Sequence, residues 1–358
     1  MVLTASNRII PSICLLALFA TSGSCSDRDL IPRQVTLSRS VSKLPFVIAL
    51  DQGLYEKYGL RVEVRMEEPA FEGGISMPSD SITARIWRRL RLVSGQQASW
   101  SPNIRVSGAN AAIVRNATRA TEPHWVSVAA TDCVVRQHIV AKDGIERLED
   151  LKGKRLGVSS IGANTDFVAL LLAERMGWDP VQDLSIMQGG NDMDDLRDGR
   201  VDALVVSERL YAAASQEGFP VLVDTSTWGE PMAGNSVMVT PEWLSDPRNR
   251  EAARRFLQAT TEGIALFHQD RELVLKILEK WHGITDRTYA EKIYDGGRWI
   301  PRKPYPCYDG IIKALERYDS NEMRRYSPED FYDDSLIREL DESGFIDSLY
   351  VTAESRSP

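Results

Sequence analysis

Cysteine and histidine are scarce in this sequence, which has only four of each among 358 residues. The cysteines are Cys14, Cys25, Cys133 and Cys307. The histidines are His124, His138, His268 and His282. No Cys-x-x-Cys pair or short Cys/His spacing occurs, so we expect no metal site and interpret each histidine as a surface or packing residue. Cys133 and Cys307 are candidates for one disulfide in an oxidising compartment, although the sequence does not establish the pairing.

A hydrophobic run long enough to cross a bilayer, about 20 residues, is also absent. Residues 9–20 form a shorter apolar run that follows one arginine and precedes small residues. This pattern is typical of a secretory signal peptide, so we assign residues 1–24 to a signal peptide and 25–34 to a linker. A buried N-terminal helix is the alternative. Cys25 follows Ser-Gly-Ser, which resembles a bacterial lipoprotein box, so Cys25 is either lipidated or free.

Basic residues do not outnumber acidic ones, and the formal net charge is −8 with histidine neutral. Nucleic-acid-binding proteins depend on basic patches, so we expect no nucleic-acid partner. The net charge does not exclude an anionic small ligand, because the electrostatic field inside a pocket can oppose the net charge. With 43% hydrophobic and 26% charged residues, the composition is that of a soluble globular protein, and the length suits two lobes.

The segments that follow the linker alternate between strand and helix patterns. QVTLSRS (34–40) and LRVEVRM (60–66) alternate apolar and polar residues, whereas the intervening LPFVIALDQGLYEKYG has helical spacing. Pro45 suits the start of that helix and Gly59 suits its end. Such a β-α-β unit predicts a parallel sheet in an α/β protein.

A second unit of this kind begins with LEDLKGKRLGVSS at residues 148–160. It predicts a strand over 155–158, then a Ser/Gly loop and a helix over 165–176. We expect a further strand at 203–206 and mostly helices from Pro241 onward. Residues 67–102 show no readable pattern.

Three strand ends run into helix starts through short polar segments. These segments contain Ser40, then Ser107, Gly108 and Asn110, then Ser160, Asn164 and Thr165. Free backbone N–H groups at helix starts, with hydroxyls beside them, suit an anionic or polar ligand. Ligands of open α/β sheets bind at the carboxyl ends of strands, so the three segments together predict a cleft. Each segment taken alone also fits a plain helix N-cap.

Four segments together resemble the SsuA/THI5-like (NMT1-type) solute-binding proteins, which serve ABC importers for nitrate, sulfonates, taurine and thiamine precursors. They are LPFVIALDQGLYEKYGLRVEV, IERLEDLKGKRLGVSSIGANTDFVALLLAERMG, GRVDALVVSE and PEDFYDDSLIRELDESGF. The resemblance covers most of residues 35–345. It implies an α/β, two-lobed periplasmic-binding-protein fold (type II-like), with a mainly parallel sheet flanked by helices in each lobe and the ligand cleft between the lobes.

The resemblance also implies the domain boundaries. Lobe 1 would combine residues 35–128 with 235–350, and lobe 2 would hold residues 129–234. Crossings near 130–133 and 230–234 would form the hinge, and residues 351–358 would be a frayed tail.

The resemblance places the polar residues of the three segments in the ligand cleft, at matching motif positions: Ser40, Ser107, Gly108, Asn110, Ser160, Asn164 and Thr165. It adds Glu208, which matches an acidic residue after the VDA strand. Trp228 lies in a loop after a strand. Its side chain either stacks on the ligand or packs against the rest of the protein. Asp166 and Glu208 disfavour a simple sulfonate or nitrate ligand unless they point away.

The expected function is that of an extracytoplasmic, periplasmic solute-binding protein that captures a small polar or anionic organic solute (sulfonate, nitrate or pyrimidine-like). It would deliver the solute to an ABC permease and its ATPase as a monomer without a cofactor, meeting the membrane only through a lipid anchor at Cys25. The alternatives are an enzyme on the same fold, acting on a pyrimidine or menaquinone precursor, and a sensory ligand-binding protein. The CCCFC motif of the pyrimidine enzymes and a G-x-S-x-G elbow are both absent, so we expect no enzyme.

Overall fold

The computed structural model describes residues 31–37, 43–66, 102–118, 124–160, 162–190 and 192–351. The expectations for the signal peptide, Cys25 and Ser40 lie outside the described residues, as do those for residues 67–101 and for the tail from residue 352. The backbone of Glu208 is described, whereas its side chain is not.

The first of two five-stranded sheets has the strand order β2-β1-β3-β10-β4. Its strands are β1 (Ile31–Leu37), β2 (Leu60–Met66), β3 (Ile104–Gly108), β4 (Val126–Ala130) and β10 (Asn235–Val239). β1 pairs in parallel with β2 and β3, whereas β10 is antiparallel to both β3 and β4. Four strands therefore point the same way, and the strand that returns from the second sheet is reversed.

The second sheet has the order β7-β6-β8-β5-β9 and the same plan. Its strands are β5 (His138–Ala141), β6 (Arg155–Val158), β7 (Ser185–Gln188), β8 (Ala203–Val206) and β9 (Val221–Asp224). β6 is parallel to β7 and β8, and β5 is antiparallel to β8 and β9. Both sheets are thus mixed, with one reversed strand each, which refines the expectation of mainly parallel sheets.

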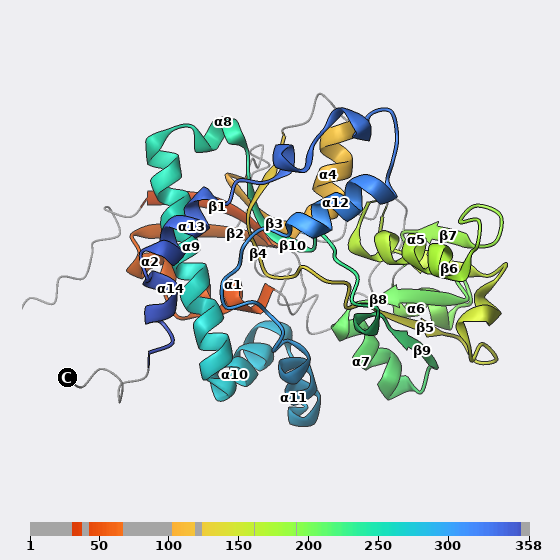
Figure 1. The fold of residues 1–358 in the computed structure, drawn as a ribbon. Helices are drawn as coiled ribbons and strands as arrows, with labels where there is room; N and C mark the ends of the chain where they lie inside the picture. The colour runs from red at the N-terminus through yellow and green to blue at the C-terminus, as the bar shows by residue number, and fades with distance from the viewer. Residues whose placement is uncertain are drawn as a thin grey trace, which may run out of the picture.

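Helices flank both sheets, which lie side by side in Figure 1. The α-helices of the first-sheet half are α1 (Leu44–Asp51), α2 (Leu54–Lys57), α4 (Ala109–Thr118), α8 (Pro241–Leu244), α9 (Pro247–Gln269), α10 (Arg271–His282), α11 (Arg287–Gly296), α12 (Tyr308–Arg317), α13 (Ser335–Glu342) and α14 (Phe345–Ser348). Those of the second-sheet half are α5 (Asn164–Met176), α6 (Met193–Arg197) and α7 (Glu208–Glu217). Short 3₁₀ turns are η2 (Leu148–Leu151), η3 (Thr225–Trp228), η4 (Met323–Arg325) and η5 (Pro328–Phe331).

The helix expected between the first two strands is broken in the middle. α1 ends at Asp51 and α2 begins at Leu54, because Gly53 takes a left-handed conformation with φ of 64°. A residue without a Cβ adopts this conformation at little cost, so the glycine ends one helix and starts the next. The break lets the ring of Tyr55 stack on Phe256 of α9, with centroids 5.0 Å apart, inside the core of the first-sheet half.

A charged cluster joins three strands of the second sheet around Asp202, the residue before β8. The Asp202 carboxylate accepts hydrogen bonds from the Arg155 backbone N–H and from Arg155 Nε and Nη2, each at 3.0 Å, and it pairs with Lys142. Only 8% of the Asp202 side chain is exposed. The hydrogen bonds from Arg155 lower the pKa of Asp202 well below its usual value.

Replacing Asp202 by asparagine should lower the free energy of unfolding by about 2 kcal/mol at pH 7, because charge-assisted hydrogen bonds are lost. A carboxylate with a lowered folded-state pKa stabilises the protein above its unfolded-state pKa of about 4, and this contribution disappears as the pH falls further. The difference between wild type and Asp202→Asn in urea unfolding should therefore shrink from pH 6 towards about pH 2. Asp143→Asn, at an exposed turn one residue from Lys142, is the control. An equal loss in both variants would contradict the assignment.

Candidate functional site

The carboxyl ends of the strands bring the predicted polar segments of the two sheets into contact. Gly108 ends β3 and Asn110 lies in the first turn of α4, whereas Asn164 begins α5 after β6. Asn110 Nδ2 lies 3.5 Å from Asn164 Oδ1. A Cβ on Gly108 would lie 3.2 Å from the same oxygen, so glycine leaves room for the Asn164 side chain. The structure therefore gathers three of the predicted residues at one junction between the sheets.

Asn110 is the most enclosed of these residues, with 0% of its surface exposed. Its Oδ1 atom has no hydrogen-bond partner among the described residues. Leaving a buried amide oxygen unpaired costs on the order of 1–3 kcal/mol, so such atoms are rare in folded proteins. The junction thus holds an acceptor that a polar ligand can satisfy by donating a hydrogen bond.

Several backbone N–H groups that we expected to be free at the helix starts are already bonded within the protein. The amides of Ala109 and Asn110 donate to the carbonyl oxygens of Gly234 and Ala233, at 2.7 and 2.9 Å. The amide of Gly162 donates to Asp166 Oδ2 at 2.9 Å. The reason is that the chain crossing back from the second sheet runs directly past the start of α4, which sequence spacing does not reveal. The first two amides of α4 are therefore not available to a ligand.

The loop between β6 and α5 is held together by its own hydroxyl groups. Thr165 Oγ1 accepts the Ser159 N–H at 3.0 Å and lies 2.8 Å from Ser159 Oγ. Ser160 is exposed, and Ser107 is buried in β3 opposite Ser236 of β10. Thr165 and Ser107 therefore shape the walls of the junction, whereas Ser160 lies at its surface.

Asp166 does not oppose a bound anion in the way that its position in the sequence suggested. Its carboxylate is buried, and Oδ2 accepts hydrogen bonds from the Gly162 N–H and from the Tyr318 hydroxyl, both at 2.9 Å. Burial raises the pKa of Asp166, while these two hydrogen bonds act in the opposite direction. The charge is thus directed towards α12 and the loop backbone.

The structure places Trp228 away from Asn164. The Trp228 ring packs on the core of the second-sheet half, and the guanidinium of Arg175 lies 5.1 Å from the ring centroid. Arg175 is in the last turn of α5, eleven residues beyond Asn164, which corresponds to about 16 Å along a helix. Glu208 begins α7 directly after β8, at the carboxyl edge of the second sheet.

Lys43, which the sequence analysis did not single out, lies at the same edge of the first sheet. It directly precedes α1, is 1% exposed, and donates from Nζ to Asn235 Oδ1 at 2.6 Å. Asn235 begins β10 and is the register partner of Gly108. A buried lysine therefore lies close to the junction. The signal in the sequence was a lysine between the polar segment 38–42 and an apolar helix.

His138 also lies at the carboxyl edge of the second sheet, where β5 begins. Its ring stacks on Tyr211 of α7 with centroids 3.8 Å apart, and Nε2 lies 3.8 Å from Asp224 Oδ2. Burial lowers the pKa of His138, and the charge of Asp224 partly offsets this effect. The interpretation of His138 as a packing residue fits these contacts.

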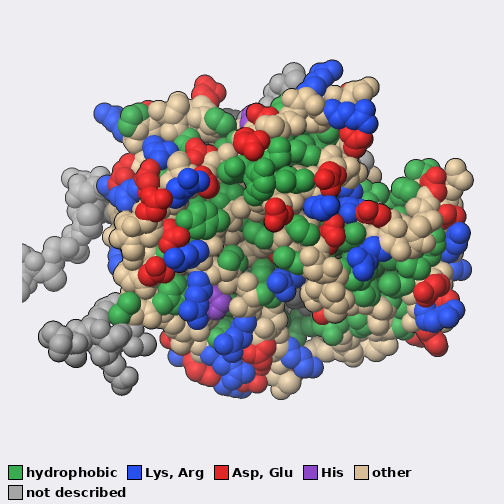
Figure 2. Space-filling view, viewed as in Figure 1, with side chains coloured by type: hydrophobic (Ala, Val, Ile, Leu, Met, Phe, Trp, Pro, Cys, Tyr) green, Lys and Arg blue, Asp and Glu red, His purple; other side chains and the backbone are tan. Residues whose placement is uncertain are grey.

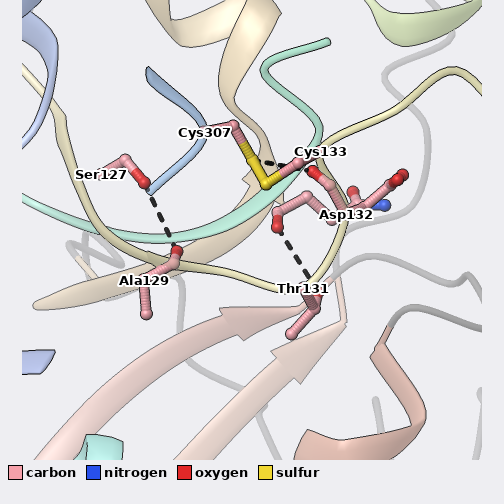
Figure 3. The surroundings of a disulfide bond; sticks show 7 residues. Ser127, Ala129, Thr131, Asp132, Cys133 and Cys307 are labelled. Atoms are coloured by element: carbon pink, nitrogen blue, oxygen red, sulfur yellow. Dashed lines mark hydrogen bonds between the residues drawn. A yellow bond between two sulfur atoms is a disulfide. The ribbon is translucent and has the colours of Figure 1, made fainter. Parts of the chain in front are cut away.

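Two chain segments cross between the sheets side by side: the first crossing, residues 130–133, and the second crossing, residues 230–234. Thr131 N donates to the Asn235 carbonyl at 2.8 Å, and Met232 N donates to the Cys133 carbonyl at 3.0 Å. Cys133, in the first crossing, forms a disulfide with Cys307, directly before α12, and this answers the pairing that the sequence left open. Figure 3 shows the bond between Cys133 and Cys307 beside Asp132, and Cys307 Sγ lies 3.1 Å from the Asp132 carbonyl oxygen.

A groove of about 820 Å³ lies elsewhere. It is lined by Val126 at the start of β4, by Pro241 after β10, and by Glu329, Asp330 and Asp333. The start of β4 and the end of the reversed strand β10 are at the edge of the first sheet opposite Gly108 and Asn110. This open acidic groove is therefore separate from the candidate site. On the face drawn in Figure 2, Lys and Arg side chains alternate with Asp and Glu rather than forming one basic field.

Among the described residues, no group of three or more His, Cys, Asp or Glu side chains is arranged to hold a metal ion. No helix in the described ranges combines the length and apolarity needed to cross a membrane.

Residues 127–272 match the family model described as NMT1/THI5 like. The match spans the first crossing, the whole second sheet, the second crossing, β10 and α9. The resemblance expected from the sequence is thereby confirmed. No curated protein sequence matches the chain significantly.

Solved structures with the same fold include binding proteins of known ligand class. The periplasmic nitrate-binding protein NrtA from Synechocystis PCC 6803 has a TM-score of 0.66 at 15% identity, covering 92% of this chain and 93% of its own. The aliphatic sulphonate binding protein SsuA from Escherichia coli has a TM-score of 0.58 at 18% identity, covering 86% and 96%. The alkanesulfonate-binding protein SsuA from Xanthomonas axonopodis pv. citri, bound to MOPS, has a TM-score of 0.60 at 15% identity, covering 87% and 98%. These matches confirm the periplasmic-binding-protein fold.

Proposed function

From the match of residues 127–272 to the NMT1/THI5-like family model, we propose that the chain is a solute-binding protein of an ABC importer. It captures a small polar or anionic organic solute and delivers it to a permease and its ATPase. The observation that carries the proposal is the junction at the carboxyl ends of the strands, where Asn110 and Asn164 meet across the two sheets near the buried side chain of Lys43.

We further propose that the two sheets define two lobes, residues 35–128 with 235–350 and residues 129–234. The support is that β1 to β4 and β10 form one sheet, whereas β5 to β9 form the other. β1 begins at Ile31 and β4 ends at Ala130, so residues 31–34, expected in the linker, and residues 129–130, expected in lobe 2, belong to strands of the first sheet. The crossings at 130–133 and 230–234 would then be the hinge. Closure around a ligand between the lobes follows the hinge motion of periplasmic binding proteins.

A binding function, rather than catalysis, fits the chemistry of the junction. Asn110, Asn164 and Ser160 are neutral hydrogen-bonding groups, which recognise a polar solute but are weak acids and bases. The solved structures described above are binding proteins, and the CCCFC motif of the pyrimidine enzymes does not occur in this sequence.

Export fits the same proposal. We propose that residues 1–24 are a signal peptide and that Cys25, either lipidated or free, is the candidate site of a lipid anchor, on the sequence pattern alone. The Cys133–Cys307 disulfide supports an oxidising compartment such as the periplasm, because disulfides persist there.

The test is a thermal-shift screen of residues 26–358 with MOPS, alkanesulfonates, nitrate, pyrimidines and thiamine precursors. A solute that binds only the folded protein stabilises it, by about 2.7 kcal/mol when the solute concentration is one hundred times Kd. The melting temperature of the protein then rises. Asn110→Ala and Asn164→Ala should each remove most of the shift. Asn249→Ala is the matched control, since Asn249 Oδ1 accepts a hydrogen bond from Arg33 in the first-sheet half. A shift that survives both junction variants would place the ligand elsewhere.

A further inference from the structure

Helix α12 lies along the two crossings rather than apart from them. Cys307, directly before the helix, is bonded to Cys133 of the first crossing. Gly310, in the first turn, touches the second crossing so closely that a Cβ would overlap the backbone of Met232 and Ala233. Near the end of the helix, Arg317 Nη2 lies 3.6 Å from Glu230 Oε1 at the start of the same crossing. The helix therefore runs beside the second crossing over its whole length.

The end of α12 also contacts α5 of the second-sheet half. Arg317 Nη1 lies 2.7 Å from Glu174 Oε2, and its guanidinium lies 4.7 Å from the Phe167 ring centroid. The Tyr318 hydroxyl donates to Asp166 Oδ2 at 2.9 Å. The Tyr318 ring packs against the core of the second-sheet half and against the cluster around α4 and α12. This residue thus joins the cores on both sides of the crossings.

Asp166 links Tyr318 to the candidate ligand loop through hydrogen bonds. The oxygen that accepts the Tyr318 hydroxyl also accepts the Gly162 N–H, two residues before Asn164. Gly162 has φ of 76°, and a Cβ on it would lie 3.1 Å from Val114 of α4. The turn is therefore pressed against the first-sheet half, and the Asp166 carboxylate binds its Gly162 N–H. Burial keeps the Tyr318 hydroxyl protonated by raising its pKa, so it remains a donor.

We propose that Tyr318 is a positioning residue for the ligand loop, of which the structure describes residues 159–160 and 162–165, and that α12 couples this loop to the crossings. The loop reaches Asn110 through Asn164, so its placement decides whether the polar groups of the junction meet. Movement at the crossings shifts α12, and Tyr318 transmits that movement to Asp166 and the Gly162 turn. This inference deepens the proposed binding function and rests on it for the role of the loop.

The experiment is hydrogen exchange on ligand-free residues 26–358 carrying Tyr318→Phe. This change removes the hydroxyl and keeps the ring, so the melting temperature should fall by only a few degrees. Exchange of the Gly162 amide, within peptides covering 159–165, should become about tenfold faster. Tyr326→Phe is the matched control, because the Tyr326 hydroxyl lies 3.5 Å from the Asn116 carbonyl within the first-sheet half. The control should leave the loop unchanged.

Two outcomes would overturn the proposal. One is unchanged exchange over 159–165 in Tyr318→Phe. The other is a uniform acceleration over the whole chain, which would mean that the hydroxyl contributes only to global stability. Neither readout needs a ligand, so failure of the solute screen and failure of this inference are distinguishable. For any solute that shifts the midpoint, Tyr318→Phe should also raise the dissociation rate, whereas Tyr326→Phe should not.

Discussion

Replacing both Cys133 and Cys307 by alanine is expected to lower the free energy of unfolding by about 3 to 5 kcal/mol. The two cysteines are separated by 174 residues. Closing so long a loop removes much of the conformational freedom of the unfolded chain, for which the chain-entropy relation gives about 5 kcal/mol. Small native-state rearrangements reduce this value, hence the range. Urea unfolding of residues 26–358 under oxidising conditions measures the loss.

Reducing agent supplies the control for this prediction. It should bring the wild type down to the stability of the double variant and leave the double variant unchanged. A loss below about 1 kcal/mol, or a variant that reducing agent still destabilises, would show that the cross-link between the crossing and α12 contributes little.

Gly310→Ala is expected to lower the free energy of unfolding by at least about 3 kcal/mol. The added Cβ would overlap the backbone of Met232 and Ala233, and a backbone cannot move aside as a flexible side chain does. Relief requires α12 to shift away from the second crossing. We therefore also expect faster hydrogen exchange over residues 159–165, because Tyr318 would move with the helix.

Gly296→Ala is the matched control for this substitution. Gly296 is the last residue of α11, and a Cβ there would meet no atom within 4 Å. Alanine at such a position should leave stability unchanged or raise it by up to about 1 kcal/mol. Equal melting temperatures for the two variants would contradict the close contact between α12 and the crossing.

Much of the local structure could be predicted from the sequence. The strand expected over 155–158 is β6, and the helix expected over 165–176 is α5, which begins one residue earlier at Asn164. Alternation of apolar residues and a glycine after the helix carry such predictions, because they act within a few residues. The helix expected up to Gly59 was wrong in one respect, since Gly53 breaks it; an internal glycine lowers helix propensity without showing whether the helix ends.

The candidate site was only partly predictable. Asn110 and Asn164 were chosen because each follows a strand, and the structure shows that they meet. Lys43 was missed because a lysine before a helix usually faces solvent, whereas here the fold buries it against Asn235. The free helix-start amides were expected from local geometry alone, and the second crossing occupies those of Ala109 and Asn110.

The sequence by itself determined the α/β alternation, the family resemblance and the polar character of the strand ends, since these depend on neighbours in the chain. The tertiary structure alone decided that Cys133 pairs with Cys307, that Tyr318 holds Asp166 and that α12 lies along the crossings. Cys133 and Cys307 are 174 positions apart in the sequence, and Tyr318 and Asp166 are 152 positions apart. Such contacts depend on how the sheets, crossings and helices pack together, and no local pattern of residues encodes that arrangement.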